Sequence, residues 1–161
     1  MKALVIYDSQ FGNTEQVARA IGDALGAEGE AMVLHAAAVT AEGLRGRDLI
    51  VVGSPTQSFH ATKPVAELLN EYDLHGVRAA AFDTRFDMAE VESRVLRFAV
   101  KAAGDNAYAA PRIATQLEKA GATLAAEPEG FIVEGTEGPL RPGELERAAV
   151  WAKSLLAVPA A

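Results

Sequence analysis

Residues 9–14, Ser-Gln-Phe-Gly-Asn-Thr, have the composition of an anion-binding loop. They lie between an unbroken apolar run and a stretch with helical spacing, and they offer hydroxyl and backbone N–H groups without any lysine or arginine. Such a loop at a helix N-terminus holds an anion by hydrogen bonds and by the helix dipole. We therefore predict a phosphate monoester site formed by Ser9, Gln10, Phe11, Gly12, Asn13 and Thr14. In the simpler alternative, Ser9 and Thr14 only cap the helix.

Other chemistries that use a loop after a first strand require residues that are absent here. A P-loop NTPase needs G-x-x-x-x-G-K-S/T, and this loop has no lysine. A dinucleotide-binding loop needs G-x-G-x-x-G, and only one glycine is present. A phosphoacceptor receiver domain needs an aspartate at the end of the third strand, where this chain reads VVGSPT. Ser54, within GSPTQ, lacks the second glycine of a serine-hydrolase elbow. With these chemistries rejected, we predict no catalytic residue.

Segments typical of strands and helices alternate along the chain. Apolar runs predict strands at 3–7, 31–35, 48–53 and 77–82, and an interrupted fifth strand at 122–125 and 131–133. Helical spacing predicts helices at 14–25, 64–72, 111–120 and 143–156. We predict an α/β protein with a single doubly wound five-stranded parallel sheet, strand order 2-1-3-4-5, and helices on both faces. Ligands of such sheets bind beyond the carboxyl ends of the strands where the order reverses.

Two helices carry specific expectations. The segment 88–103 has Met88, Val91, Val95, Phe98 and Ala102 at helical spacing, which predicts an amphipathic helix inserted after strand four. It would serve as a lid over the site, as an oligomer contact or as extra packing. In the closing helix, the same spacing predicts that Leu145, Ala149, Ala152 and Leu156 face the core.

Composition narrows the class of protein. At 161 residues the chain fits one domain, 1–161, with a formal net charge of −7 and no run of Lys and Arg for a nucleic-acid backbone. The absence of cysteine excludes disulfides and Cys-ligated metals, and three scattered histidines do not form a metal cluster. No signal peptide or membrane-spanning stretch is expected, so the predicted location is cytoplasmic, with no membrane partner. An acidic surface favours basic protein partners.

The chain resembles the flavodoxin family. The resemblance rests on SQFGNT, on VVGSPTQSFHATKP and, more weakly, on EGFIVEG before the last helix, and it covers nearly the whole chain apart from segment 88–103. It implies that FMN is the cofactor and that Ser9, Gln10, Gly12, Asn13 and Thr14 bind its 5′-phosphate. It also implies that the second loop, Pro55, Thr56, Gln57, Ser58 and Phe59, lies along the flavin ring.

Two loops depart from the family pattern. Many flavodoxins have a glycine after the position of Gln57, whereas this chain continues with Ser58 and Phe59; Phe59 or His60 would stack on the ring, or Phe59 would pack against the core. After strand four, the resemblance implies that Asp83 accepts from the flavin N3–H and that Thr84 donates to a flavin carbonyl. Arg85 either points inward and stabilises negative charge on the ring or forms a surface pair with Asp83. Tyr108, within GDNAY, returns to the site or only begins a helix.

The resemblance implies an electron carrier that works between redox proteins, as a monomer or weak homodimer. Two alternatives are an FMN-dependent quinone or protoporphyrinogen reductase on the same fold, and an interaction protein that has lost the flavin.

Overall fold

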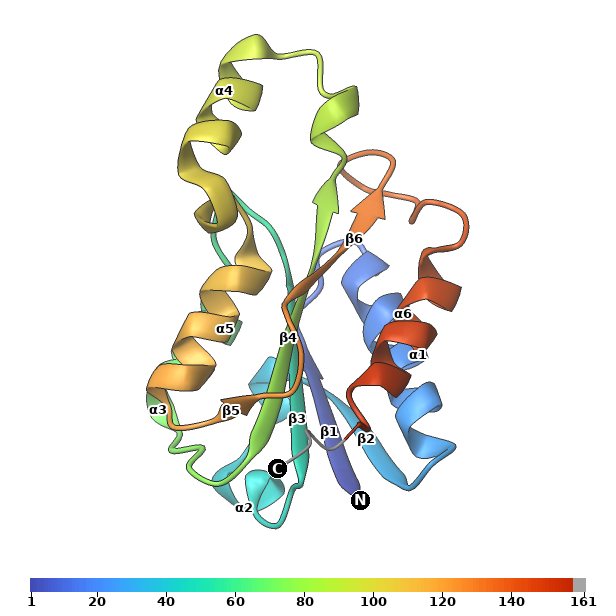
Figure 1. Ribbon diagram of the computed structural model, residues 1–161, viewed down its shortest axis with the longest axis vertical. Coiled ribbons are helices and arrows are strands. Elements are labelled where there is room, and N and C mark those ends of the chain that lie inside the picture. Colours follow the sequence, from blue (N-terminus) through green and yellow to red (C-terminus); the bar gives the residue numbers. More distant parts are fainter. Residues whose placement is uncertain (158–161) are drawn as a thin grey trace.

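A parallel sheet forms the centre of the computed structural model, which describes residues 1–157 (Figure 1). The strands are β1 (Lys2–Tyr7), β2 (Glu30–His35), β3 (Leu49–Pro55), β4 (Arg78–Phe86), β5 (Thr123–Leu124) and β6 (Glu129–Val133). They follow the order β2-β1-β3-β4-β5, and β6 also pairs with β4. The predicted order is therefore confirmed. The interrupted fifth strand is confirmed as well, because β5 pairs with the start of β4 and β6 with its end.

Helices cover both faces of this sheet. The helices α1 (Asn13–Gly26) and α6 (Glu144–Ser154) lie on one face, and α3 (Lys63–Glu71) and α5 (Ala109–Lys119) lie on the other (Figure 1). All four agree with the predicted helices to within two residues at each end. The shorter elements are α2 (Ala41–Leu44), α4 (Arg94–Ala103) and the 3-10 turns Ala36–Ala38, Met88–Glu90 and Gly104–Ala107. Among the described residues no helix is long and apolar enough to cross a membrane.

The core has two halves because successive strand side chains point to opposite faces. In β1, Leu4 and Ile6 pack with the α3 and α5 residues, whereas Val5 and Tyr7 pack with the α1 and α6 residues. The second half also holds an aromatic group in which the rings of Phe82, Phe131 and Trp151 meet edge to face. The sheet is therefore covered on both sides, which leaves the ends of its strands as the place for a site.

The register of the sheet aligns three strand ends. Tyr7 of β1 lies opposite Gly53 of β3, and Gly53 lies opposite Phe82 of β4. The residues that follow these positions therefore meet at one edge. Strand β4 continues to Phe86. Asp83, Thr84 and Arg85 therefore belong to the strand, whereas the sequence had suggested that they form a loop after it.

The inner face predicted for the last helix is wrong in one position. Leu145 is exposed, the buried apolar residues of this segment are Ala148, Ala152 and Leu155, and Ala149 and Leu156 pack against the core while partly buried. The first turn is rotated because a Glu144 carboxylate oxygen accepts a hydrogen bond from the Ile132 N–H of β6 at 2.6 Å. This contact draws Glu144 inward and turns Leu145 toward solvent.

The predicted inserted helix is shorter than expected, and two of the apolar residues from which it was predicted face solvent. Segment 88–103 forms the turn Met88–Glu90 and then α4. Ser93 caps the start of α4, because its hydroxyl accepts a hydrogen bond from the Leu96 N–H. Val95 and Phe98 are 81% and 74% exposed. The physical reason is that α4 lies beyond the end of the sheet (Figure 1), so no sheet face is available to bury that side of the helix.

Gly53 provides a test of this packing. A Cβ at this position would come within 2.0 Å of the Phe82 ring. We expect Gly53→Ala to lower the free energy of unfolding by about 2 kcal/mol, as overpacking of a core does, measured by urea denaturation. Gly26→Ala is the control, because its Cβ would meet only ordinary contacts. Equal stabilities for the two variants would contradict the packing described here.

Candidate functional site

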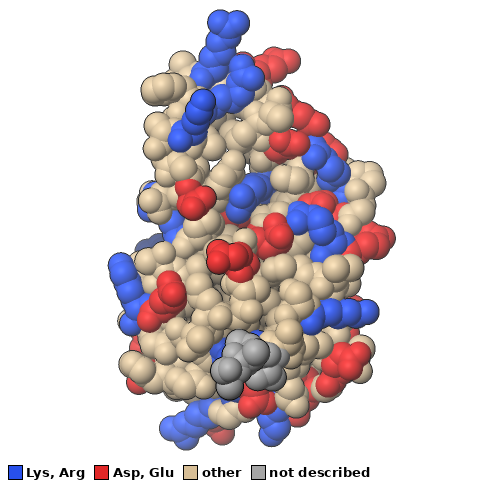
Figure 2. Space-filling view, viewed as in Figure 1, with Lys and Arg blue, Asp and Glu red and all other residues tan. Residues whose placement is uncertain are grey.

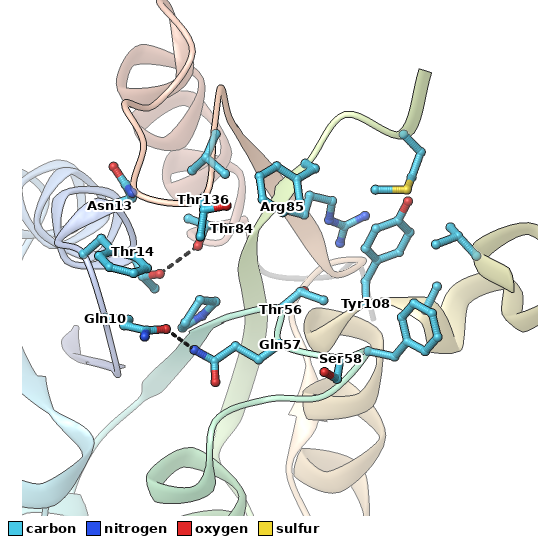
Figure 3. Close-up of a pocket in the computed structure, with 18 of the residues that line it drawn as sticks. Gln10, Asn13, Thr14, Thr56, Gln57, Ser58, Thr84, Arg85, Tyr108 and Thr136 are labelled. Atoms are coloured by element: carbon cyan, nitrogen blue, oxygen red, sulfur yellow. Dashed lines mark hydrogen bonds between the residues drawn. The ribbon is translucent and has the colours of Figure 1, made fainter. Parts of the chain in front are cut away.

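A cavity of about 350 Å³ lies at the carboxyl ends of β1, β3 and β4 (Figure 3). Most of the residues singled out from the sequence line it: Ser9, Gln10, Phe11, Asn13, Thr14, Pro55, Thr56, Gln57, Ser58, Phe59, Thr84 and Arg85. Gly12 lies in the first loop between two lining residues, and Asp83 lies behind the wall. Arg85 is the one charged residue among the described residues that line the cavity.

The first loop presents hydrogen-bond donors at the start of α1. The Ser9 hydroxyl accepts from the Gly12 N–H at 3.0 Å, which closes a tight turn. Gly12 has a φ of 91°, a conformation that favours glycine, and α1 begins at the next residue. The N–H groups of the first helical turn have no partner within their own helix. They are therefore available to an anion, and the Gly12 position has no Cβ that would obstruct it.

Two contacts hold this loop to the rest of the site. The hydroxyls of Thr14 and Thr84 are 2.8 Å apart and buried, which joins α1 to β4 (Figure 3). One of these hydroxyls donates to the other, so the second keeps its proton for a ligand. Asn13 donates from its side-chain amide to the Glu137 carbonyl at 3.1 Å. The Asn13 side-chain nitrogen is thus bonded to the loop before α6. The backbone N–H of Asn13 remains as a donor for a ligand.

Hydrogen bonds join the second loop to β4 and to the start of α5, but the tip of the loop is strained. The Thr56 N–H donates to the Thr84 carbonyl at 3.0 Å, and the Thr56 hydroxyl accepts from the Ala109 N–H at 2.9 Å. At the tip, Gln57 and His60 pair through their backbones around Ser58 and Phe59. These two residues have φ values of 47° and 72°, although neither is a glycine. A non-glycine residue in this region costs on the order of 1 kcal/mol or more, so the loop holds a conformation that its sequence does not favour.

The Gln10 and Gln57 side chains connect the first two loops. The Gln57 amide nitrogen donates to the Gln10 side-chain oxygen, and Figure 3 shows this bond beside the cavity. Both residues are exposed. The contact links the loop at the start of α1 to the loop that follows β3.

Asp83 and Arg85 form a pair within the wall of the cavity. The Arg85 Nε and Nη2 donate to the two Asp83 carboxylate oxygens at 2.6 and 2.7 Å. The Asp83 side chain is fully buried, and it also accepts from the Ala110 N–H at the start of α5 at 2.8 Å. Burial raises the pKa of the Asp83 carboxyl, while the Arg85 hydrogen bonds act in the opposite direction.

This arrangement corrects the expectation for Asp83 and combines the two alternatives for Arg85. Asp83 does not line the cavity, and both of its oxygens are already used, so it positions Arg85 instead of contacting a ligand. The Asp83–Arg85 pair exists, but it is not on the surface, and Arg85 lines the cavity at the same time.

Tyr108 and Gly130 hold the Arg85 guanidinium from two sides. The guanidinium carbon lies 3.7 Å from the centre of the Tyr108 ring, a cation–π contact. A Cβ at position 130 would lie 2.1 Å from the Arg85 Nε, so only glycine leaves this space. With Nε and Nη2 bonded to Asp83, the Nη1 group remains as a donor. The cavity therefore contains one fixed positive group.

Sequence reasoning missed several residues of the cavity. Val133 and Thr136 come from the end of β6 and the loop after it, and Phe86 ends β4. The order of the sheet could have indicated β6, because it pairs with the end of β4. Leu96 and Val100 come from the inserted segment, of which the sequence had singled out Met88, another residue that lines the cavity. Leu96 and Val100 were overlooked because the prediction followed the helical spacing of Val95 and Phe98, which lie on the side of α4 that faces away from the cavity.

Most of the chain matches known proteins. The family model of flavodoxin matches residues 5–151. A solved flavodoxin from the domain Archaea has a TM-score of 0.74 and 23% identity over 96% of each chain. Flavodoxin 1 from Bacillus cereus has a TM-score of 0.73 and 19% identity over 97% of each chain. The rubredoxin oxygen:oxidoreductase of Desulfovibrio gigas is similar over 96% of this chain but only 35% of its own, at 18% identity and a TM-score of 0.69.

Asp83→Asn tests the buried pair. Removing one charge leaves the Arg85 guanidinium with little solvent and no counterion, a change that typically costs about 3 kcal/mol. We expect the free energy of unfolding at neutral pH to fall by about this amount in urea denaturation. Asp73→Asn is the control, because Asp73 pairs with His75 at the surface. A loss as small as that of the control would show that Asp83 has no structural role.

Proposed function

Because the chain belongs to the flavodoxin family, we propose that it binds one FMN noncovalently and carries electrons between redox proteins. The observation that carries the proposal is a donor-rich loop without lysine at the start of α1, directly joined to a cavity with apolar and aromatic walls. This is a combination that suits a phosphate monoester attached to a flat aromatic ring system.

The residues present fit the two ends of FMN. The N–H groups of Gln10, Phe11, Asn13 and Thr14, together with a hydroxyl of the Thr14–Thr84 pair, supply the donors that a phosphate dianion requires, while the Gly12 N–H is bonded to Ser9. Phe59, Tyr108 and Pro55 supply an apolar and aromatic surface for the ring, with the polar Thr56 and Gln57 at its edge and Arg85 as the charged group beside it. A cavity of about 350 Å³ is in the range of cofactor sites, which run from ~300 to ~1,000 Å³.

The protein's part in electron transfer is to bind, orient and bias the cofactor. FMN, when bound, supplies one-electron and two-electron transfer. The positive charge of Arg85 favours the additional negative charge that reduction brings to the ring, and Asp83 fixes the orientation of that charge while weakening it. Burial beside Phe59 and Leu96 limits the access of water.

A reductase is the second candidate. The observation in its favour is that α4 contributes Leu96 and Val100 to the same cavity and so partly encloses it. An enzyme of this kind would oxidise NAD(P)H and reduce a quinone with the FMN-loaded protein as catalyst. Turnover with both substrates would favour the reductase, and its absence in an FMN-loaded sample would favour the carrier.

Titration with FMN and riboflavin tests the phosphate site. We expect the chain to quench FMN fluorescence on binding and to bind riboflavin far more weakly, because riboflavin lacks the phosphate. Thr14→Ala should weaken FMN binding by roughly ten- to a hundredfold, the value of a hydrogen bond to a charged group, and should leave the affinity for riboflavin unchanged. Thr115→Ala, a change on the exposed face of α5, is the control. Equal affinity for the two flavins would refute the phosphate site.

Arg85→Gln tests the charge beside the ring. With FMN bound, we expect the two-electron midpoint potential to become more negative by about 30 mV, which corresponds to about 1.4 kcal/mol. Arg85→Lys keeps the charge and should recover most of the shift. The potential is measured by dye-equilibrated reduction followed by visible absorbance. An unchanged potential in Arg85→Gln would show that the guanidinium does not act on the ring.

A further inference from the structure

The outer face of α4 exposes large apolar side chains. Val95 and Phe98 are 81% and 74% exposed, and no residue of α4 is buried. By contrast, β1, β3 and the two helices on each face of the sheet bury their apolar sides in the two core halves. An exposed aromatic and an exposed β-branched residue at (i, i+3) on one helix form a compact apolar contact area.

The same face carries positive charge. Arg94, Arg97 and Lys101 lie on α4, a helix that contains no Asp or Glu, and within residues 1–157 none of the three takes part in an ion pair. Figure 2 shows basic side chains grouped over α4 at one end of the molecule. The nearby acids Asp87 and Glu90 are paired with Arg141. The exposed acids Glu92 and Asp105 flank the two ends of α4, so the positive charge is confined to the helix itself.

The charge of the rest of the chain is of the opposite sign. Apart from these three residues, the chain has 12 Lys and Arg against 22 Asp and Glu. An acidic partner would therefore be attracted to the end of the molecule at α4 and repelled by the remainder. A basic partner would be directed away from α4. The distribution of charge thus selects both the partner's sign and its orientation.

The helix that carries this face also borders the candidate site. Leu96 and Val100 line the cavity, while Val95 and Phe98 face solvent. A protein bound to the outer side of α4 would be separated from the cavity by the thickness of one helix. Resting on the proposed function, this places the partner's own redox centre near the FMN.

We propose that the α4 outer face, defined as Arg94, Val95, Arg97, Phe98 and Lys101, is the docking surface for a redox partner protein whose contact surface has an acidic area beside an apolar one. Aromatic residues and arginine are the types that dominate protein interfaces. The cations on one side of this apolar pair supply steering and register. This partner is the opposite of the basic one that net charge alone suggested.

Two other occupants fit the surface less well. An anionic membrane would attract the three cations and could accept the two apolar side chains, while the remaining acidic chain would be repelled by the lipid. A symmetric pair of copies would place the cations of one α4 opposite those of the other. The acidic partner is the occupant that the charge distribution favours.

Charge reversal on α4 tests the proposal. The probe is a plant-type ferredoxin, a small acidic iron–sulfur protein, added to the ¹⁵N-labelled chain as purified at about 20 mM and about 200 mM salt. We expect binding at low salt with chemical-shift changes centred on α4, and weaker binding at high salt. R94E/R97E/K101E should lower the affinity at least about tenfold.

A matched control separates local from overall charge. R45E/K119E/K153E makes the same change in net charge at three exposed residues, one directly after α2, one in α5 and one in α6, that lie away from α4 (Figure 1). We expect it to lower the affinity much less than the α4 reversal does. Equal effects of the two triple variants would overturn the proposal, and so would shift changes centred elsewhere or an absence of binding at low salt.

The apolar part is tested with V95S/F98S. Because both side chains are exposed, the variant should keep its melting temperature and lose ferredoxin affinity several-fold, whereas Val150→Ser, an equally exposed position on α6, should lose none. Unchanged affinity in V95S/F98S would overturn the apolar role. Cytochrome c, a small basic haem protein, is the opposite probe, and its binding should not weaken when α4 is reversed.

The remaining occupants and the proposed function have separate readouts. Binding to phosphatidylglycerol vesicles that is lost in R94E/R97E/K101E, or concentration-dependent self-association that is lost in the same variant, would overturn the protein-partner proposal. The ferredoxin titration needs no FMN, so a failure to bind FMN and a failure to dock are distinguishable. With FMN loaded, the α4 reversal should slow electron exchange with ferredoxin and leave FMN affinity unchanged.

Discussion

The alignment of three parallel strand ends is the constraint on which the whole site depends. Tyr7, Gly53 and Phe82 lie side by side across β1, β3 and β4, so the residues after them are brought to one edge. Packing in the core maintains this register, because Gly53 leaves room for the Phe82 ring, and that ring contacts Phe131 and Trp151. A slip of one residue would exchange the two faces of a strand and separate the loops.

Electrostatics divides the site into two parts that work differently. The first loop relies on oriented N–H groups at the start of α1, a source of positive potential that involves no side-chain charge. The part of the cavity beside β4 has a full charge on Arg85, but Asp83 balances and fixes it. The pair is anchored in turn to the start of α5 through the Ala110 N–H. Both ends of the cavity therefore depend on a helix N-terminus, although only one of them presents its N–H groups to the cavity.

The sequence predicted the sheet order and the first loop because both depend on local patterns. An apolar run followed by Ser9–Thr14 contains its own strand, turn and helix start. The wall around Asp83 was not predictable in the same way. Its partners, Arg85, Ala110 and the space at Gly130, come from β4, α5 and β6, and only the folded register brings them together. The strained turn at Ser58 and Phe59 was also hidden, since nothing local in these residues favours a positive φ.

The segment 88–103 shows why helical periodicity alone does not identify an inner face. The apolar residues of α4 extend around a broad part of its circumference, from Val95 to Val100, and only the side with Leu96 and Val100 reaches the cavity. In α1, α3 and α5, which cover the sheet, the apolar stripe matches the surface that it covers. On α4, which lies beyond the sheet, the apolar surface exceeds what the cavity covers, and the excess stands beside Arg94, Arg97 and Lys101. Folding alone gains nothing from exposed Phe98 and Val95, so the physical reason for their presence is to be sought in a contact outside this chain.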